Sequence, residues 1–276
     1  MAVAAEAIEH AVRAALAEDV GTGDVTTEAT VSRDAVATAE LLLKEPGVVC
    51  GLWLAEEVFR ALDPGLRFEA LVAEGAQLDA PAPVARVTGA ARAILTGERV
   101  ALNFVGRLSG IATLTRRYVD AVAGTGAAIL DTRKTTPGLR ALEKHAVACA
   151  GGRNHRFGLD DGVLVKDNHL RAAGSIAVAV AGARETTDLP IEVECETLEQ
   201  VGEALAAGVD AILLDNMSLD DLRAAVALVA GRARLEASGG ITLETIRSVA
   251  ETGVDEISVG ALTHSARSLD VSLEVR

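Results

Sequence analysis

From residue 127 onward, short apolar segments alternate with amphipathic helical segments, and this alternation most constrains the fold. The expected strands are Ala127–Asp131, Val163–Val165, Ile191–Val193, Ala211–Leu214, Leu235–Ala237 and Ile257–Val259. The expected helices are Leu139–Ala150, Ala172–Arg184, Leu198–Ala207, Leu219–Val229 and Leu243–Ala250. Such alternation predicts a parallel sheet covered by helices. Six strands favour a complete or incomplete α/β barrel over a short open sheet.

The first third of the chain lacks this alternation and predicts an α+β domain. Its expected helices are a first one that ends before Gly21 and a second at Leu52–Leu62, and its expected strands are Val36–Leu43, Leu66–Val72 and Val84–Val87. A long helix over Ala91–Ala123 follows, for which we expect a break near Gly106 or Gly110. The alternating segment Leu269–Val275 predicts a strand that returns to the first domain. We therefore expect an N-terminal domain over 1–106, a barrel over 107–266 and a returning strand within 267–276.

Composition excludes several classes of function. The chain has 26 basic and 40 acidic residues and a net charge of −14, which argues against nucleic acid as a partner. No uncharged apolar stretch is long enough to span a membrane. The three cysteines, Cys50, Cys149 and Cys195, are widely spaced and show no metal-binding spacing, which predicts free thiols in a reducing compartment. Since Glu6 and Glu9 stand where a signal peptide needs positive charge, we expect a cytoplasmic protein.

Each expected strand of the barrel is followed by polar or charged residues or by glycine. In chain order these are Asp131, Thr132, Arg133 and Lys134; Lys166, Asp167, Asn168 and His169; Glu194; Asp215 and Asn216; Ser238, Gly239 and Gly240; and Gly260. The carboxyl ends of barrel strands form the active-site face, so these side chains are expected to converge there. A dinucleotide-binding fingerprint and a P-loop are both missing from the sequence.

The charges in this region are unevenly distributed. Between Arg133 and Arg171 there are eight basic and four acidic residues, although the whole chain is acidic. A pocket with several cations concentrates and orients small anions. Glu194 and Asp215 stand at neighbouring strand ends, where they could contact a Mg²⁺–pyrophosphate complex or a ribose, or else neutralise lysines as ion pairs. Asp160 and Asp161 could contact a metal or cap a turn, and we favour the turn.

Seven motifs resemble the quinolinate phosphoribosyltransferase family, in family order over nearly the whole chain. They are Glu18-Asp19-x-Gly21-x-Gly23-Asp24-x-Thr26-Thr27, Asp131-Thr132-Arg133-Lys134-Thr135-x-Pro137-Gly138, Gly151-Gly152-x-Asn154-His155-Arg156, Lys166-Asp167-Asn168-His169, Glu192-x-Glu194, Leu214-Asp215-Asn216 and Ala237-Ser238-Gly239-Gly240-Ile241. The resemblance implies an N-terminal α/β sandwich domain packed on an incomplete α/β barrel. It also implies transfer of a phosphoribosyl group from phosphoribosyl pyrophosphate to quinolinate, with decarboxylation.

The resemblance further implies roles for individual residues. The two quinolinate carboxylates would contact Arg133, His155, Arg156 and Lys166, together with Arg99 from the neighbouring subunit of a homodimer, with a hexamer of three dimers as the alternative assembly. Phosphoribosyl pyrophosphate and its Mg²⁺ would contact Lys134, Glu194 and Asp215, which form the expected catalytic set. The 5′-phosphate would lie against Ser238, Gly239 and Gly260, with His264 nearby, and Thr132 and Gly240 would complete the substrate-binding set.

Other functions fit part of the pattern. A related phosphoribosyltransferase could use nicotinate without decarboxylation, and a paralogue of this fold is tied to molybdate handling. A phosphate-binding barrel isomerase or aldolase would use Lys134 or Lys166 as a Schiff base. A non-enzymatic ligand-binding barrel would not require cations and carboxylates to converge on one face. The four basic side chains favour a dicarboxylate substrate over a monocarboxylate.

Overall fold

The computed structural model describes residues 3–276, which divide into two compact units. The first unit comprises the chain up to Arg116, Thr135–Gly151 and Leu262–Arg276, and the second comprises Arg117–Lys134 and Gly152–Ala261. The division lies within a helix, ten residues beyond the expected boundary at 106. Among the described residues, no helix is long and apolar enough to cross a membrane.

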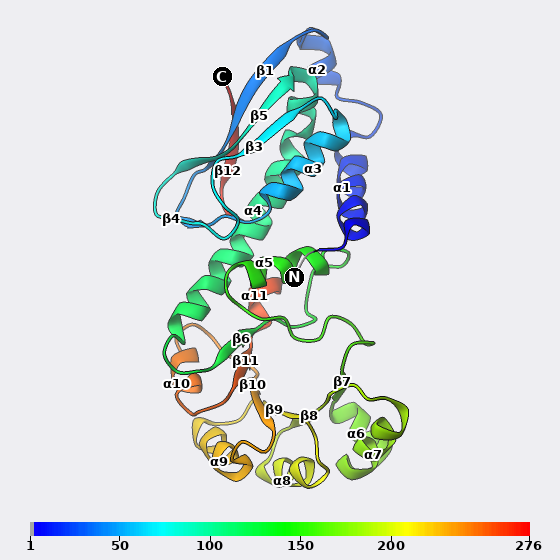
Figure 1. Cartoon of the computed structure of the whole chain (residues 1–276), viewed down its shortest axis with the longest axis vertical. Helices are drawn as coiled ribbons and strands as arrows, with labels where there is room; N and C mark the ends of the chain where they lie inside the picture. Colours follow the sequence, from blue (N-terminus) through cyan, green and yellow to red (C-terminus); the bar gives the residue numbers. More distant parts are fainter. Residues whose placement is uncertain (1–2) are drawn as a thin grey trace. The chain divides into compact units, whose positions relative to one another are not determined.

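The first unit contains a four-stranded sheet with the order β12-β1-β5-β3 (Figure 1). Its helices are α1 (Ala5–Val20), α2 (Val25–Thr30), α3 (Leu52–Leu62), the first part of α4 (Ala91–Ala121), α5 (Arg140–Cys149) and most of α11 (Ala261–His264). Its strands are β1 (Val36–Leu43), β2 (Gly47–Val48), β3 (Arg67–Ala70), β4 (Gln77–Leu78), β5 (Ala82–Ala90) and β12 (Val271–Val275). Side chains of β1 alternate, so that Ala39, Leu41 and Leu43 are buried on one face. The last strand, β12, pairs antiparallel with β1, which confirms that the chain returns to its first domain.

Helix α4 runs without interruption over 31 residues, so the expected break near Gly106 or Gly110 was wrong. Both glycines instead lie where the segment leading into β12 crosses the helix. A Cβ on Gly106 would stand 2.9 Å from the carbonyl oxygen of Leu269, and one on Gly110 would stand 2.9 Å from the carbonyl carbon of Arg267. The glycines permit close backbone contact and do not end the helix.

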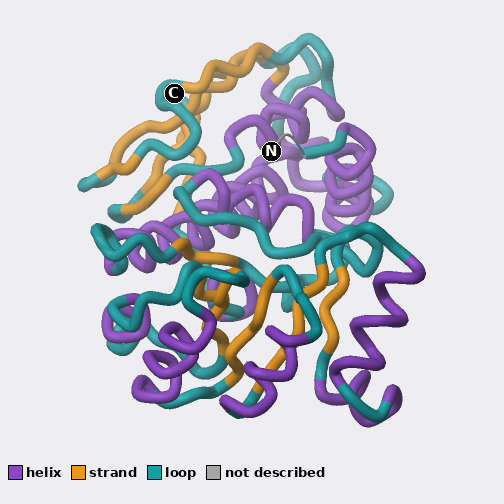
Figure 2. The backbone as a smooth tube through the Cα atoms, turned by 60° about the horizontal axis from the view of Figure 1, so that its bottom comes forward, coloured by secondary structure: helices purple, strands orange, loops and turns teal. Residues whose placement is uncertain are grey.

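The second unit is a six-stranded parallel sheet with the order β6-β11-β10-β9-β8-β7. Its strands are β6 (Ala128–Leu130), β7 (Val163–Val165), β8 (Ile191–Cys195), β9 (Ala211–Asp215), β10 (Arg234–Ser238) and β11 (Glu256–Ser258). Its helices are α6 (Asp167–Ala173), α7 (Ile176–Thr186), α8 (Leu198–Ala206), α9 (Leu219–Val229) and α10 (Ile246–Ala250). Figure 2 shows these helices along the outside of the strands. Because β6 and β7 do not pair, the sheet forms an incomplete barrel, as expected.

The sequence patterns predicted all six barrel strands but missed α6. This short helix has no buried residue, so it has no hydrophobic periodicity to reveal it. Its first turn contains the Lys166–His169 motif, in which the backbone N–H of Lys166 donates to Nδ1 of His169 (2.9 Å). The motif therefore begins a helix directly at the carboxyl end of β7.

Candidate active site

The segment that carries His155 and Arg156 is anchored to β6. The backbone N–H of Arg153 donates to a β6 carbonyl (2.8 Å) on the edge that is not paired with β11. Asp131, fully buried at the end of β6, accepts the backbone N–H of His155 (3.0 Å) at one oxygen and the side-chain amide of Asn154 (2.5 Å) at the other. A buried carboxylate that accepts two hydrogen bonds holds this loop in place, and it thereby positions the side chains of His155 and Arg156.

Two buried glutamates face the imidazole of His155 inside the barrel. Nε2 of His155 lies 2.9 Å from Oε2 of Glu192 on β8 and 3.4 Å from Oε2 of Glu236 on β10. Glu236 is only 1% exposed, and its burial, followed by the charge of Glu192, raises its pKa from 4.5 to about 8. The neutral form of Glu236 is therefore favoured at neutral pH. These three residues also have the ligand types and spacing of a cation site.

Arg133 and Arg156 are two cations close enough to influence each other. Among residues 3–276, the Nε atoms of both are buried and lack a hydrogen-bond partner. Burial lowers the pKa of Arg156, and the charge of Arg133 lowers it further, against the opposite effects of Asp161 and Glu192. The Nη1 group of Arg156 donates to the carbonyl of Gly162 (3.0 Å). Two guanidinium groups that repel each other in a half-buried site are suited to an anion with two carboxylates.

Two further carboxylates lie at adjacent strand ends. Glu194 on β8 accepts a hydrogen bond from Nζ of Lys166 (2.5 Å), so the ion pair considered from the sequence does form. Asp215 ends the neighbouring strand β9 and accepts the side-chain amide of Asn216 (2.8 Å). Carboxylate oxygens on neighbouring strands match the donors that Mg²⁺ prefers, so Glu194 and Asp215 fit a magnesium complex that shares its other oxygens with a ligand and water.

The loop after β10 has the backbone geometry expected for a phosphate site. Gly239 and Gly240 both have positive φ angles, of 98° and 59°. A Cβ on Gly239 would stand 2.9 Å from the backbone nitrogen of Asn216, so only glycine fits there. The hydroxyl of Ser238, in turn, accepts a hydrogen bond from Ser258 (3.0 Å).

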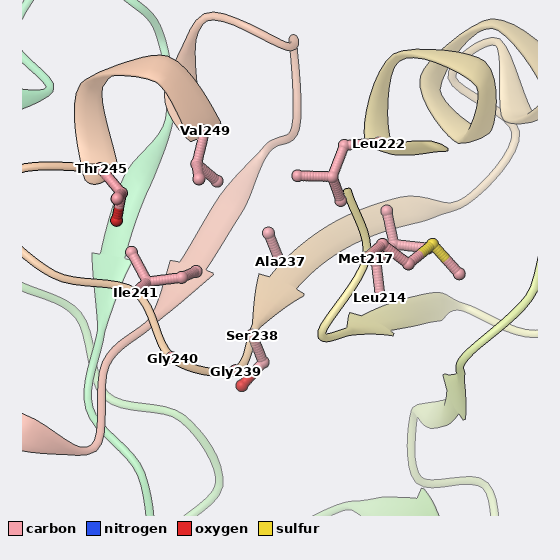
Figure 3. A pocket seen from close by; sticks show the side chains of 10 residues that line it. All are labelled: Leu214, Met217, Leu222, Ala237, Ser238, Gly239, Gly240, Ile241, Thr245 and Val249. Carbon is pink, nitrogen blue, oxygen red and sulfur yellow. The ribbon is translucent and has the colours of Figure 1, made fainter. Parts of the chain in front are cut away.

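A pocket of about 110 Å³ lies beside this loop (Figure 3). Six of its ten lining residues have apolar side chains, and among them Leu222 and Val249 reach it from α9 and α10. Ligand pockets usually enclose about 300–1,000 Å³. This pocket is therefore too small for a phosphoribosyl group, and it adds no binding residue beyond the Ser238–Gly240 loop.

The remaining expected residues lie outside these contacts. Lys134 is exposed, and its backbone N–H donates to the hydroxyl of Thr132 (3.1 Å). Gly260 directly precedes α11. Arg99, exposed on α4, and His264, which contacts the hydroxyl of Ser265 (2.7 Å), belong to the first unit. Their roles remain predictions.

Sequence reasoning missed one member of the site and correctly interpreted a turn. Glu236 was overlooked, although a glutamate flanked by Leu235 and Ala237 in a buried strand is itself a signal of a polar interior. Asp161 caps a turn as expected, since its carboxylate accepts the backbone N–H groups of Phe157 (2.5 Å) and Gly158 (2.8 Å).

The incomplete parallel barrel and the basic groups at its strand ends define an α/β-barrel protein with cationic side chains on one face. The family model described as "Quinolinate phosphoribosyl transferase, C-terminal domain" matches residues 111–274. The model of the corresponding N-terminal domain matches residues 24–109. The chain belongs to the quinolinate phosphoribosyltransferase family.

Individual relatives are similar to this chain over nearly their full lengths. The nicotinate-nucleotide pyrophosphorylase [carboxylating] of Mycobacterium leprae is 46% identical, with 98% of each chain covered. The probable nicotinate-nucleotide pyrophosphorylase [carboxylating] of a Synechocystis strain is 47% identical over 94% of this chain and 90% of that protein. The solved structure of the nicotinate-nucleotide pyrophosphorylase from Francisella tularensis is 40% identical, with a TM-score of 0.96 over 100% of this chain and 98% of that one.

Proposed function

We propose that this chain is a decarboxylating phosphoribosyltransferase that converts quinolinate and phosphoribosyl pyrophosphate to nicotinate mononucleotide, pyrophosphate and carbon dioxide. The names of its relatives support the reaction. The observation that carries the choice of substrate is the pairing of Arg133 with Arg156, two partly buried cations that match the two carboxylates of a pyridine dicarboxylate.

The dicarboxylate is bound by a cluster of basic groups. Arg133 and Arg156 contact its carboxylates, and Lys166 adds a third cation after exchanging its bond with Glu194 for one with the substrate. His155 is oriented by Asp131 through the backbone and by Glu192 through the ring. With His155 held in this orientation, quinolinate binds with its own ring nitrogen directed toward phosphoribosyl pyrophosphate.

The transfer step needs no protein nucleophile. The lone pair of the ring nitrogen forms the new bond to the anomeric carbon of the ribose, and the bond to pyrophosphate breaks with its electron pair. Glu194 stabilises the positive charge that develops at the anomeric carbon. When bound, Mg²⁺ supplies charge neutralisation for the pyrophosphate; Glu194 and Asp215 would hold it. Lys134 stabilises the departing pyrophosphate.

Decarboxylation then uses the substrate's own ring. The positively charged pyridinium accepts the electron pair left when the 2-carboxylate departs as carbon dioxide, and a proton from solvent completes nicotinate mononucleotide. The protein contributes position and a less hydrated setting for that carboxylate. Backbone N–H groups of Ser238, Gly239, Gly240 and Gly260 bind the 5′-phosphate, with Thr132 and His264 beside the phosphoribosyl group.

The complete site includes a second subunit. Arg99 contacts the quinolinate of the neighbouring subunit in a homodimer, or in a hexamer built of three such dimers. The exposure of Arg99 on α4 supports this role, because the side chain is available to another molecule. The enzyme acts in the cytoplasm.

The reaction is tested by mixing purified protein with quinolinate, phosphoribosyl pyrophosphate and Mg²⁺, with nicotinate replacing quinolinate in a parallel tube. We expect nicotinate mononucleotide and carbon dioxide from quinolinate alone. Arg133→Ala and Arg156→Ala should each lower kcat/KM for quinolinate at least about tenfold, the effect of losing one charge-assisted contact. Arg223→Ala, an exposed arginine on α9, is the matched control. Wild-type turnover by either site variant, or turnover of nicotinate alone, would refute the dicarboxylate assignment.

A further inference from the structure

Two cysteines that are far apart in the sequence meet inside the first unit. Cys50 lies between β2 and α3, and Cys149 is the last residue of α5. The two thiols interact with each other, and this interaction raises the pKa of Cys50 and lowers that of Cys149. The side chain of Cys50 is completely buried. This pair could not be predicted from the sequence, because the spacing of the two cysteines matches no metal-binding or redox motif.

An imidazole and a carboxylate lie close to the two thiols. His145 precedes Cys149 by four residues on α5, so both occupy the same side of the helix. A ring nitrogen of His145, the sulfur of Cys50 and a carboxylate oxygen of Glu74 all lie within 4.8 Å of one another. The loop after Glu74 also closes on Cys149, since a Cβ on Gly75 would stand 3.4 Å from its sulfur. Three donors therefore lie close enough to share one cation, and the sulfur of Cys149 lies beside that of Cys50 as a candidate fourth donor.

The donors are held in place by their surroundings. The carboxylate of Glu74 accepts the backbone N–H groups of Gly51 (2.9 Å) and Leu52 (2.7 Å), which fixes its orientation at the start of α3. The ring of His145 meets the indole of Trp53 edge-on, with centroids 5.4 Å apart and planes at 81°. Ligands oriented by hydrogen bonds and packing are typical of metal sites in proteins.

We propose that Cys50, Cys149, His145 and Glu74 bind one soft divalent cation, best matched by zinc, as a structural site. Thiolate, imidazole and carboxylate in a group of four are the donors of tetrahedral zinc sites, whereas Mg²⁺ selects oxygen donors alone. None of the four residues belongs to the proposed catalytic set. The cation would join the start of α3, the loop at Glu74 and the end of α5, all within the first unit. The inference does not depend on the proposed reaction.

The test is zinc uptake by the full-length protein, stripped of metal and kept reduced, in competition with a chromophoric chelator. We expect about one equivalent of tightly bound zinc per chain and a rise in Tm with zinc, both lost in Cys50→Ser and His145→Gln. Cys195→Ser is the matched control, because Cys195 is also buried but lies in the second unit. Circular dichroism without metal establishes that each variant is folded.

Cobalt(II) binding to the wild type gives a second readout that needs no variant. We expect the intense visible absorption of tetrahedral cobalt together with a thiolate-to-cobalt charge-transfer band in the near ultraviolet. Absence of the thiolate band, or equal zinc uptake by the wild type and Cys50→Ser, would overturn the proposal. Loss of uptake in Glu236→Gln with uptake retained in Cys50→Ser would assign the metal to the His155 cluster and would also overturn it.

Discussion

Replacing Glu236 by glutamine should remove a pH-dependent loss of stability from the barrel. In the folded chain the pKa of Glu236 is raised from 4.5 to about 8, first by burial and then by the charge of Glu192. An unfolded chain ionises this carboxyl near pH 4.5, so between these two values the folded state holds one more proton. Stability contributed by the neutral carboxyl is therefore complete below about pH 4.5 and is lost as the pH rises toward about 8.

The size of the effect follows from the displacement of the pKa. At about 1.4 kcal/mol for each pH unit, the displacement from 4.5 to about 8 sets an upper limit of about 5 kcal/mol. Since Glu236 is only 1% exposed, solvent screening takes little from this value. Because Glu236 is coupled to His155 and Glu192, the proton is shared among three groups, and the stability effect falls below this upper limit. Glutamine keeps the shape and cannot ionise, so the variant should gain stability over the wild type as the pH rises.

Urea unfolding of wild type and Glu236→Gln, from about pH 5 to about pH 9, measures the difference. Circular dichroism is the appropriate probe, because the single tryptophan, Trp53, lies in the first unit and Glu236 in the second. Glu185→Gln, on the exposed side of α7, controls for the loss of one surface carboxylate. A stability difference between wild type and Glu236→Gln that stays constant over this pH range would refute the reasoning.

Further predictions concern packing and substrate binding. Gly110→Ala should lower the unfolding free energy by about 1–3 kcal/mol, because the new methyl group would overlap the backbone of Arg267. Gly182→Ala, in α7 with no atom near the added methyl group, should instead stabilise the chain by about 0.5–1 kcal/mol, and urea denaturation of both variants checks the opposite signs. Asp131→Asn should raise KM for quinolinate about tenfold, because one acceptor that holds the His155 loop is lost. Unchanged KM in steady-state assays would show that this loop is held by other contacts.

Much of the fold was determined by local sequence patterns. The sequence predicted the strand β1 and the helices α3 and α9 with both of their observed ends. The polar residues after each apolar strand were correctly expected at one edge of the sheet, because parallel strands all direct their carboxyl ends to the same side. These features depend on neighbours in the sequence, and for this reason they could be deduced from it.

Contacts between distant segments were decided by the tertiary structure alone. The glycines of α4 suggested a helix break, and only the chain segment that crosses them explains why glycine stands at these positions in a continuous helix. Glu236 became part of the site because β10 places it beside His155, which comes from a loop about eighty residues earlier. Cys50 and Cys149 meet only because β2, α3 and α5 pack in one unit. Burial and proximity set the charge states and ligand geometry of these groups, and neither is encoded in local spacing.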